Sequence, residues 1–217
     1  EMTNHTITID ELTKEVLKDQ AYYEKSGGGV TASGGECMLQ AEFIKDFFRE
    51  LKSLGVNTAI DTSGQAPFSS FLHVLPITDY ILYDIKLMDE TEHIRYTGQS
   101  NKLILENLNK IAALIKGKAL QSKLIIRTPL IPEATATIRN IQSIADYLVS
   151  SRVADSVDLW ELCAFNSACA SKYARLGKDW AYNNVPLLCK EFAESLLGSV
   201  SRYDGLASKT RLTGILY

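Results

Sequence analysis

The stretch Gly27-Gly28-Gly29-Val30-Thr31-Ala32-Ser33-Gly34-Gly35-Glu36 decides the fold class of this chain. Its centre is a short run with β-branched residues, which predicts a strand at residues 30–33. Three glycines precede this run and two follow it, and the last two are followed by the carboxylate of Glu36. Because glycine has no Cβ, a ligand can lie directly against the backbone at such a strand end. The stretch therefore predicts a ligand-binding loop that follows a strand.

Strands and helices alternate along the rest of the chain. Apolar runs predict further strands at residues 56–61, 80–86, 123–130 and 157–162. Helical periodicity predicts helices at residues 9–25, 41–54, 68–75, 101–115, 137–148 and 186–197, with Asp10 as the N-cap of the first, and a turn is expected at 96–98. Strands that alternate with helices, and that are apolar enough to be covered on both faces, predict an α/β fold with a parallel sheet. About five strands are too few for a closed eight-stranded barrel, so we expect an open, partial barrel.

Composition limits the class of protein. The chain has 217 residues, of which 46% are hydrophobic and 23% are charged, and its formal net charge is −3. This length and composition predict one domain, residues 1–217, with a sizeable core. The negative net charge argues against a nucleic-acid binder, and no apolar run reaches the ~18 residues of a membrane span. The first residue is Glu1 rather than Met, so we expect the chain to be cut from a longer protein.

Polar residues follow each predicted strand at its carboxyl end, where parallel α/β folds place their active sites. The ends read Ser33-Gly34-Gly35-Glu36, Asp61-Thr62-Ser63-Gly64, Asp84-Ile85-Lys86, Arg127-Thr128-Pro129, and Glu161-Leu162-Cys163 followed by Asn166. Helix caps explain one or two such residues but are a weaker explanation for the whole set. The pattern favours a shared ligand site. A phosphate loop is excluded, because Gly34 is followed by Gly35 and Glu36 instead of Gly-Lys-Ser/Thr.

Four motifs, taken in order, resemble a known family. They are the stretch 27–36 followed by Leu39-Gln40, then Asp61-Thr62-Ser63-Gly64, Asp84-Ile85-Lys86 and Leu130-Ile131-Pro132. Together they resemble the radical S-adenosylmethionine (SAM) enzymes that activate glycyl radical enzymes, the pyruvate formate-lyase activating enzyme family. The resemblance covers nearly the whole chain, from about Ile7 onward. It implies a partial (β/α)6 barrel of the radical SAM kind, whose first strand and cluster loop are missing from this chain.

The resemblance also implies a site for SAM and a monovalent-cation site. The SAM-binding residues would be Gly34, Gly35 and Glu36 at the methionine end, with Asp61, Ser63, Asp84, Lys86, Arg127 and Asn166. The cation ligands would be Asp61, Thr62, Asp84 and the Leu82 carbonyl. By residue chemistry alone, Glu36 and carbonyls near Gly34 suit the ammonium of SAM, and Lys86 suits its carboxylate. A sugar phosphate or a metal-bound enolate would use similar residue types.

The chemistry implied by the resemblance is reductive. In the family a [4Fe-4S] cluster donates one electron to SAM, which splits into methionine and a 5′-deoxyadenosyl radical. That radical takes a hydrogen atom from a backbone glycine of a partner enzyme. The resemblance therefore implies a glycyl radical enzyme as partner, an electron donor such as flavodoxin or ferredoxin, and a cytoplasmic location.

The chain departs from the family pattern in three places. The Cys-x3-Cys-x2-Cys cluster motif is absent, and Cys37, Cys163, Cys169 and Cys189 are too widely spaced to replace it. We therefore expect no catalytic residue in this chain and no activity from it alone. Cys37 stands where many relatives have Pro, and we expect it to fill an apolar pocket rather than to react. Asn166 stands where they often have His, and an amide cannot carry a proton as His does.

Two alternatives stay open at this point. An unrelated (β/α) barrel, such as an aldolase with Lys86 as its Schiff-base lysine, predicts a phosphate or carbonyl site and no affinity for SAM. A non-catalytic SAM- or partner-binding module predicts that the native reading frame also lacks the three cysteines.

Overall fold

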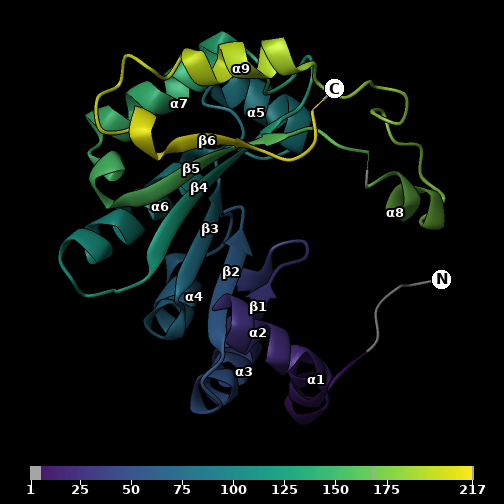
Figure 1. Ribbon diagram of the computed structural model, residues 1–217, viewed down its shortest axis with the longest axis vertical. Coiled ribbons are helices and arrows are strands. Elements are labelled where there is room, and N and C mark those ends of the chain that lie inside the picture. Colours follow the sequence, from purple (N-terminus) through teal and green to yellow (C-terminus); the bar gives the residue numbers. More distant parts are fainter. Residues whose placement is uncertain (1–5, 168, 217) are drawn as a thin grey trace.

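The computed structural model describes residues 6–167 and 169–216. Within these residues, six parallel strands form one sheet in the order β1-β2-β3-β4-β5-β6 (Figure 1). The strands are β1 (Gly29–Ala32), β2 (Asn57–Thr62), β3 (Tyr80–Asp84), β4 (Lys123–Leu130), β5 (Val157–Ala164) and β6 (Thr210–Thr213). Each strand pairs with its neighbour in the sequence, which confirms the predicted α/β fold with a parallel sheet.

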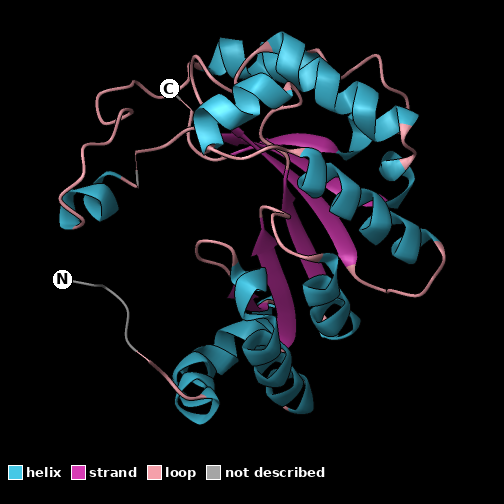
Figure 2. Ribbon diagram, turned by 180° about the vertical axis from the view of Figure 1, so that it is seen from behind, coloured by secondary structure: helices cyan, strands magenta, loops and turns pink. Residues whose placement is uncertain are grey.

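Helices connect the strands and wrap around the outside of the curved sheet (Figure 2). They are α1 (Ile9–Val16), α2 (Gln20–Ser26), α3 (Ala41–Ser53), α4 (Phe68–Val74), α5 (Glu90–Thr97), α6 (Lys102–Lys116), α7 (Ile138–Ser150), α8 (Ala170–Arg175) and α9 (Lys190–Gly198). Among the described residues, no helix is both long and apolar enough to cross a membrane.

The two faces of the sheet differ in burial. Along β2, β3 and β4 every second residue is buried, and the residues between them are half-buried or exposed. The buried set includes Ile60, Tyr83 and Ile126, which join Phe48 and Leu108 from the helices in one hydrophobic core. Burial of such apolar surface contributes about 25 cal/mol per Å². In the described structure only the convex face is packed under helices, so the prediction that the strands are covered on both faces is wrong.

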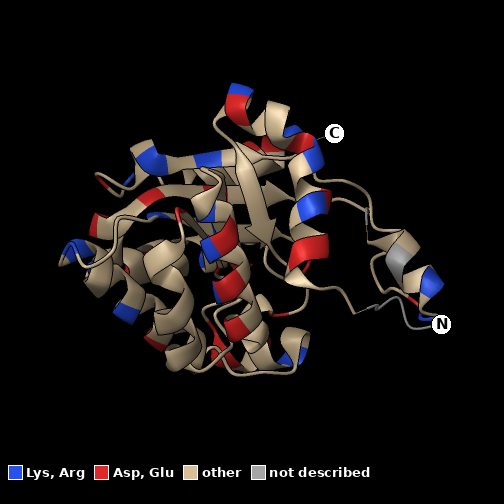
Figure 3. Ribbon diagram, turned by 90° about the horizontal axis from the view of Figure 1, so that it is seen from below, with Lys and Arg blue, Asp and Glu red and all other residues tan. Residues whose placement is uncertain are grey.

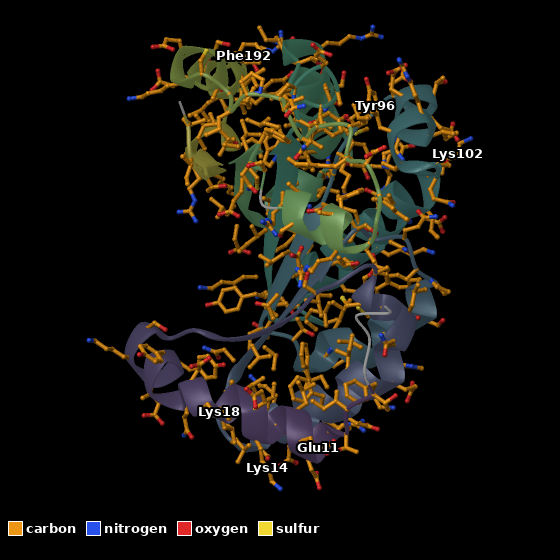
Figure 4. The ribbon with its side chains drawn as sticks, turned by 90° about the vertical axis from the view of Figure 1, so that its right-hand side faces the viewer. Glu11, Lys14, Lys18, Tyr96, Lys102 and Phe192 are labelled. Atoms are coloured by element: carbon orange, nitrogen blue, oxygen red, sulfur yellow. The ribbon has the colours of Figure 1, made fainter. Side chains whose placement is uncertain are left out.

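The concave face opens between α8 and α1. Figure 4 looks toward this side and shows α8, in green, in front of the strands. Glu11 and Lys14 of α1, and Lys18 in the 3-10 turn that follows it, lie along the lower border in that view, and Tyr96 of α5 lies near the upper border. We call the carboxyl ends of the strands, with the loops that follow them, the rim of the sheet.

The first predicted helix, at residues 9–25, is interrupted by a 3-10 turn at Leu17–Asp19. Its N-cap is Thr8, not the predicted Asp10. The Glu11 N–H donates to the Thr8 hydroxyl at 3.3 Å, and the Thr8 N–H donates to the Glu11 carboxylate at 2.9 Å. This is a complete capping box, which satisfies two backbone N–H groups reciprocally, and the helix begins at Ile9, the first residue of the predicted range.

Several elements in the second half of the chain differ from the prediction. Instead of a turn at 96–98, the helix α5 runs up to Gly98, and the Asp89 side chain caps it by accepting from the Glu92 N–H at 3.0 Å. The strand β6 adds a sixth strand to the predicted five, and α8 was not predicted. The last helix begins at Lys190, not at 186. The two elements that were not predicted, α8 and β6, have six and four residues, which are too few for a helical or strand period to be recognised in the sequence.

Acidic and basic residues are interspersed over the outer helices (Figure 3). Many of them form exposed ion pairs, such as Lys110 with Glu106 and Lys116 with Asp155. Exposed pairs of this kind each stabilise a fold by at most about 1 kcal/mol. The charges that matter for a ligand are those on the concave face of the sheet.

Candidate active-site rim

The loop after β1 exposes its backbone at Gly34 and Gly35. A Cβ built on either glycine would meet no atom within 4 Å, so both open onto free space. Gly34 has a φ of +140°, a conformation that other residues rarely adopt. Gly64 differs, because a Cβ there would lie 2.0 Å from the Tyr83 hydroxyl oxygen. Gly64 is therefore required by packing, whereas Gly34 and Gly35 leave backbone accessible to a ligand.

Glu36 ties this loop to the end of β2. Its Oε1 accepts hydrogen bonds from the Thr62 hydroxyl at 2.7 Å and from the Met38 N–H at 3.1 Å. Its Oε2 accepts from the Ser63 N–H at 2.9 Å and from the Ser63 hydroxyl at 2.5 Å. Partly buried carboxylates are costly unless they are hydrogen-bonded in this way. The Glu36 carboxylate thus holds the loop after β1 to the loop after β2. The part of the β1 loop that stays exposed to a ligand is the backbone of Gly34 and Gly35.

A row of charged side chains crosses the concave face. The register pairs Asp84 of β3 with Arg127 of β4. It then pairs Arg127 with Glu161 of β5, and Glu161 with Arg211 of β6. The Arg211 Nη2 donates to Glu161 Oε1 at 3.3 Å, and the Arg127 Nε lies 3.7 Å from Glu161 Oε2. Because registered neighbours share one face of a sheet, four strands contribute charges of alternating sign to one surface.

Arg127 also reaches β2. Its Nη1 donates to Asp61 Oδ2 at 3.1 Å, and the Ser33 hydroxyl donates to the same oxygen at 3.3 Å. Burial opposes the charge on Arg127, but Cys163, Asp61 and Asp84 around it outweigh burial and raise the pKa of the guanidinium. The charged Arg127 therefore connects the loop after β1 to the centre of the concave face.

Asp61 and Asp84 each keep one oxygen without a hydrogen bond from the described residues. The Oδ2 of Asp84 accepts from Lys86 Nζ at 2.8 Å, and the Oδ2 of Asp61 takes the bonds given above. No hydrogen bond from the described part of the chain reaches either Oδ1. Both side chains are 25% exposed, and Asp61 is in register with Leu82. Carboxylate and carbonyl oxygens are the ligands that hard cations prefer.

The other predicted site residues lie at or just beyond this rim. Thr62 and Ser63 direct their hydroxyls at Glu36. Lys86 is 30% exposed and pairs with Asp84, so it does not lie in the dry apolar pocket that activates a Schiff-base lysine. Asn166 is exposed and follows the end of β5. The structure thus gathers the predicted residues of the first four strand ends and leaves Asn166 at the border.

The cysteines lie in different environments. Burial, with Glu36 and Asp61 nearby, raises the pKa of the Cys37 thiol to about 11. Cys37 is 6% exposed and packs in the core, as expected of a pocket-filling residue. Cys163 is half-buried, and Cys169 and Cys189 are exposed. Within the described residues, no three His, Cys, Asp or Glu side chains form a group that could hold a metal ion.

Glu161 was predicted as a strand-end residue of the shared ligand site but not as a SAM-binding residue, and Arg211 was not predicted at all. Glu161 is recognisable in the sequence as a strand-end residue, but nothing in its neighbourhood shows that it contacts Arg127. Arg211 lies on β6, which was not predicted. The alternating, β-branched run Thr210-Arg211-Leu212-Thr213 is the signal that identifies this strand.

Curated relatives of this chain are activating enzymes. The chain is 36% identical to the (2S)-3-sulfopropanediol dehydratase activating enzyme of Klebsiella oxytoca over 88% of its length, and 36% identical to the pyruvate formate-lyase 2-activating enzyme of Escherichia coli (strain K12) over 86%. It spans 58% and 60% of the lengths of these two proteins. It is 33% identical to the pyruvate formate-lyase-activating enzyme of Staphylococcus epidermidis, with 82% of this chain and 70% of that protein covered. No family model matches the chain.

Solved structures show the same fold. A domain of pyruvate-formate lyase-activating enzyme from Bacteroides vulgatus ATCC 8482 superimposes with a TM-score of 0.66 at 25% identity, covering 86% of this chain and 99% of that one. A radical SAM methyltransferase from Sphaerobacter thermophilus gives a TM-score of 0.67 at 12% identity, over 95% of this chain and 57% of that one. The open six-stranded sheet is thus a radical SAM partial barrel. The chain belongs to the pyruvate formate-lyase-activating enzyme family, the radical SAM enzymes that activate glycyl radical enzymes.

Proposed function

We propose that the rim formed by the loops after β1, β2 and β3 binds SAM. One observation carries the proposal: a loop with open glycine backbone contacts Asp61, and Asp61 and Asp84 each keep an oxygen that receives no hydrogen bond from the described residues. The hydrogen bond from the Ser33 hydroxyl to Asp61 ties the loop that carries Gly34 and Gly35 to the end of β2. Partly buried acceptors without partners favour a ligand that carries donors or positive charge. SAM carries both an ammonium and a sulfonium.

Each loop has its own part in this proposal. The carbonyls of Gly34 and Gly35 accept hydrogen bonds from the ammonium, and Glu36 holds that backbone in place. Lys86 and Arg127 provide positive charge for the carboxylate of SAM, since charge-assisted hydrogen bonds to carboxylates are strong. Ser63 and Asn166 add neutral hydrogen bonds at the border of the ligand.

We also propose a monovalent-cation site next to SAM. Its ligands are Asp61 and Asp84, with Thr62 and the Leu82 carbonyl. It is supported by the register of Asp61 with Leu82, and by the one oxygen of each carboxylate that no described residue reaches with a hydrogen bond. The Thr62 hydroxyl donates to Glu36 and accepts from the Gly64 N–H at 3.0 Å, which leaves one lone pair of its oxygen for the ion.

The family also implies a [4Fe-4S] cluster, and the described residues do not fit one. Such clusters are held by grouped thiolates, whereas no group of metal-binding side chains occurs among the described residues. We therefore assign to this chain only the binding and orientation of SAM and the shielding of the site from water, and we propose that cluster chemistry belongs to a longer protein.

That longer protein, we propose, generates a glycyl radical on a partner enzyme. The relatives are named as activating enzymes of several different lyases and dehydratases, so the partner is proposed only as a class. An electron donor such as flavodoxin or ferredoxin, and a cytoplasmic location, complete the proposal.

Calorimetric titration of SAM tests the site, with the protein of the full native reading frame purified without oxygen. Asp84→Asn removes one carboxylate at the proposed site, and we expect SAM affinity to fall about tenfold, which corresponds to about 1.4 kcal/mol. Asp155→Asn is the matched control, because it removes a carboxylate that is also ion-paired, with Lys116 at 2.7 Å, but precedes β5 at the opposite end of the sheet. Equal effects of the two substitutions, or no SAM binding by the wild type, would contradict the proposal.

A further inference from the structure

We infer that Glu161 is a positioning residue for Arg127. It holds the guanidinium back from Asp61, so that the open oxygen of Asp61 stays available to a ligand. This inference rests on the proposed SAM site and adds to it a residue that does not itself contact the ligand.

Arg127 lies between two carboxylates that come from opposite sides of its strand. Its Nη1 donates to Asp61 of β2 at 3.1 Å, and its Nε lies 3.7 Å from Glu161 of β5. The Nε is buried and makes no hydrogen bond with the described residues. An arginine beside a single carboxylate commonly forms two parallel hydrogen bonds with it. Here the guanidinium is shared, and Asp61 receives a hydrogen bond from it on one oxygen only.

Glu161 is itself held in place. Arg211 of β6 donates to its Oε1 at 3.3 Å, which leaves Oε2 toward Arg127. The Glu161 side chain is 18% exposed, less than Asp61 at 25% and Arg127 at 32%. Attraction between charges is stronger where less water surrounds them. Glu161 therefore attracts Arg127 from the side opposite Asp61, at the longer distance of 3.7 Å.

Loss of the charge on Glu161 would end this competition. The Arg127 guanidinium would then donate hydrogen bonds to both oxygens of Asp61. The Oδ1 of Asp61, which the proposed site leaves open to a ligand, would no longer be available. The neutral Gln has nearly the same size, and the pairing of β4 with β5 rests on the backbone, so the fold itself should change little. A positioning role thus predicts a loss of binding without a matching loss of stability.

The test measures SAM affinity and thermal unfolding for variants of the full native protein. We expect Glu161→Gln to weaken SAM binding about tenfold and to change the unfolding midpoint of the ligand-free protein by less than about 2 °C. Glu161→Asp keeps the charge, and we expect it to recover affinity to within about threefold of the wild type. Asp155→Asn removes a remote ion pair and should leave affinity unchanged.

A second variant, Arg211→Met, tests the same competition between Glu161 and Asp61 for Arg127, by removing the ion-pair partner of Glu161. Arg211 is 61% exposed, so its replacement should be tolerated. Without it, Glu161 is free to draw Arg127 further from Asp61, and SAM affinity should not fall. This variant also keeps the test informative if Glu161→Gln does not fold.

The outcomes separate this inference from the proposed function. If the wild type binds SAM and Glu161→Gln binds it equally well, the role of Glu161 is wrong and the SAM site stands. If Glu161→Gln and Glu161→Asp lose affinity and stability together, or Arg211→Met weakens binding, Glu161 is merely structural. If the wild type does not bind SAM, the proposed site fails and this inference fails with it.

Discussion

At the scale of single residues, hydrogen-bond partners separate side chains that hold the site from those that face a ligand. Glu36 receives four hydrogen bonds from its own chain, whereas one oxygen of Asp61 and one of Asp84 receive none from the described residues. All three were predicted as cofactor-binding residues on the same grounds. Their different surroundings show that Glu36 holds the loop, and we propose that the two aspartates face the ligand.

Cys37 gives a prediction about alkaline pH. Its thiol has a pKa of about 11 in the folded protein, so between about pH 9 and 11 the unfolded chain loses this proton while the folded protein keeps it. Stability from the protonated thiol is therefore intact below about pH 9 and decreases as the pH rises, by at most about 3 kcal/mol. Urea unfolding of the wild type and of Cys37→Ala at pH 7 to 11 measures this.

We expect the stability difference between these two proteins to shrink as the pH rises, because only the wild type has this group. The buried hydroxyls of Tyr83 and Tyr147 also have raised pKa values, but they are common to both proteins. Cys189→Ala is the control, because this thiol is exposed. A difference that stays constant over this pH range would show that Cys37 does not have a raised pKa.

At the scale of elements, the helix α7 fixes the loops that follow β3 and β4. Asn140 in its first turn is 7% exposed, and its Nδ2 donates to the Lys86 carbonyl at 2.8 Å and the Thr135 carbonyl at 3.1 Å. Its Oδ1 accepts from the Met88 N–H at 3.2 Å. One side chain thereby sets the path of the loop that carries Lys86.

Asn140→Leu should therefore destabilise the protein by about 3 kcal/mol, because it leaves several buried backbone groups without partners. Urea unfolding at neutral pH measures the change. Arg139→Leu, at the exposed neighbouring position, should change stability by no more than about 0.5 kcal/mol. Comparable stability of the two variants would show that Asn140 does not hold these loops.

Long periodic elements were predictable from the sequence and short ones were not. The strand β4 matches its predicted range, and α3 differs by one residue at its end, because each has enough residues for its period to be read. The strand β6 and helix α5 are short, and α5 is defined more by its caps at Asp89 and Gly98 than by an apolar stripe. Caps depend on side-chain hydrogen bonds that periodicity does not report.

At the scale of the whole molecule, the parallel topology made the rim predictable. Polar residues at successive strand ends meet at one edge whenever the strands are parallel, so the predicted set gathers as expected. The openness of the concave face was not predictable. Leu82, Ile125 and Leu159 lie on that face and are half-buried, and in the sequence they look like residues packed under helices. What covers a face depends on the curvature of the sheet, not on the strand sequences.

We propose that this chain is the SAM-binding part of a radical SAM activating enzyme. The most direct measurement is the EPR spectrum of the full native reading frame, expressed and reduced without oxygen, recorded with and without SAM. The account predicts a [4Fe-4S] signal that changes when SAM is added. A protein without iron and without such a signal would contradict the account and favour a non-catalytic binding module.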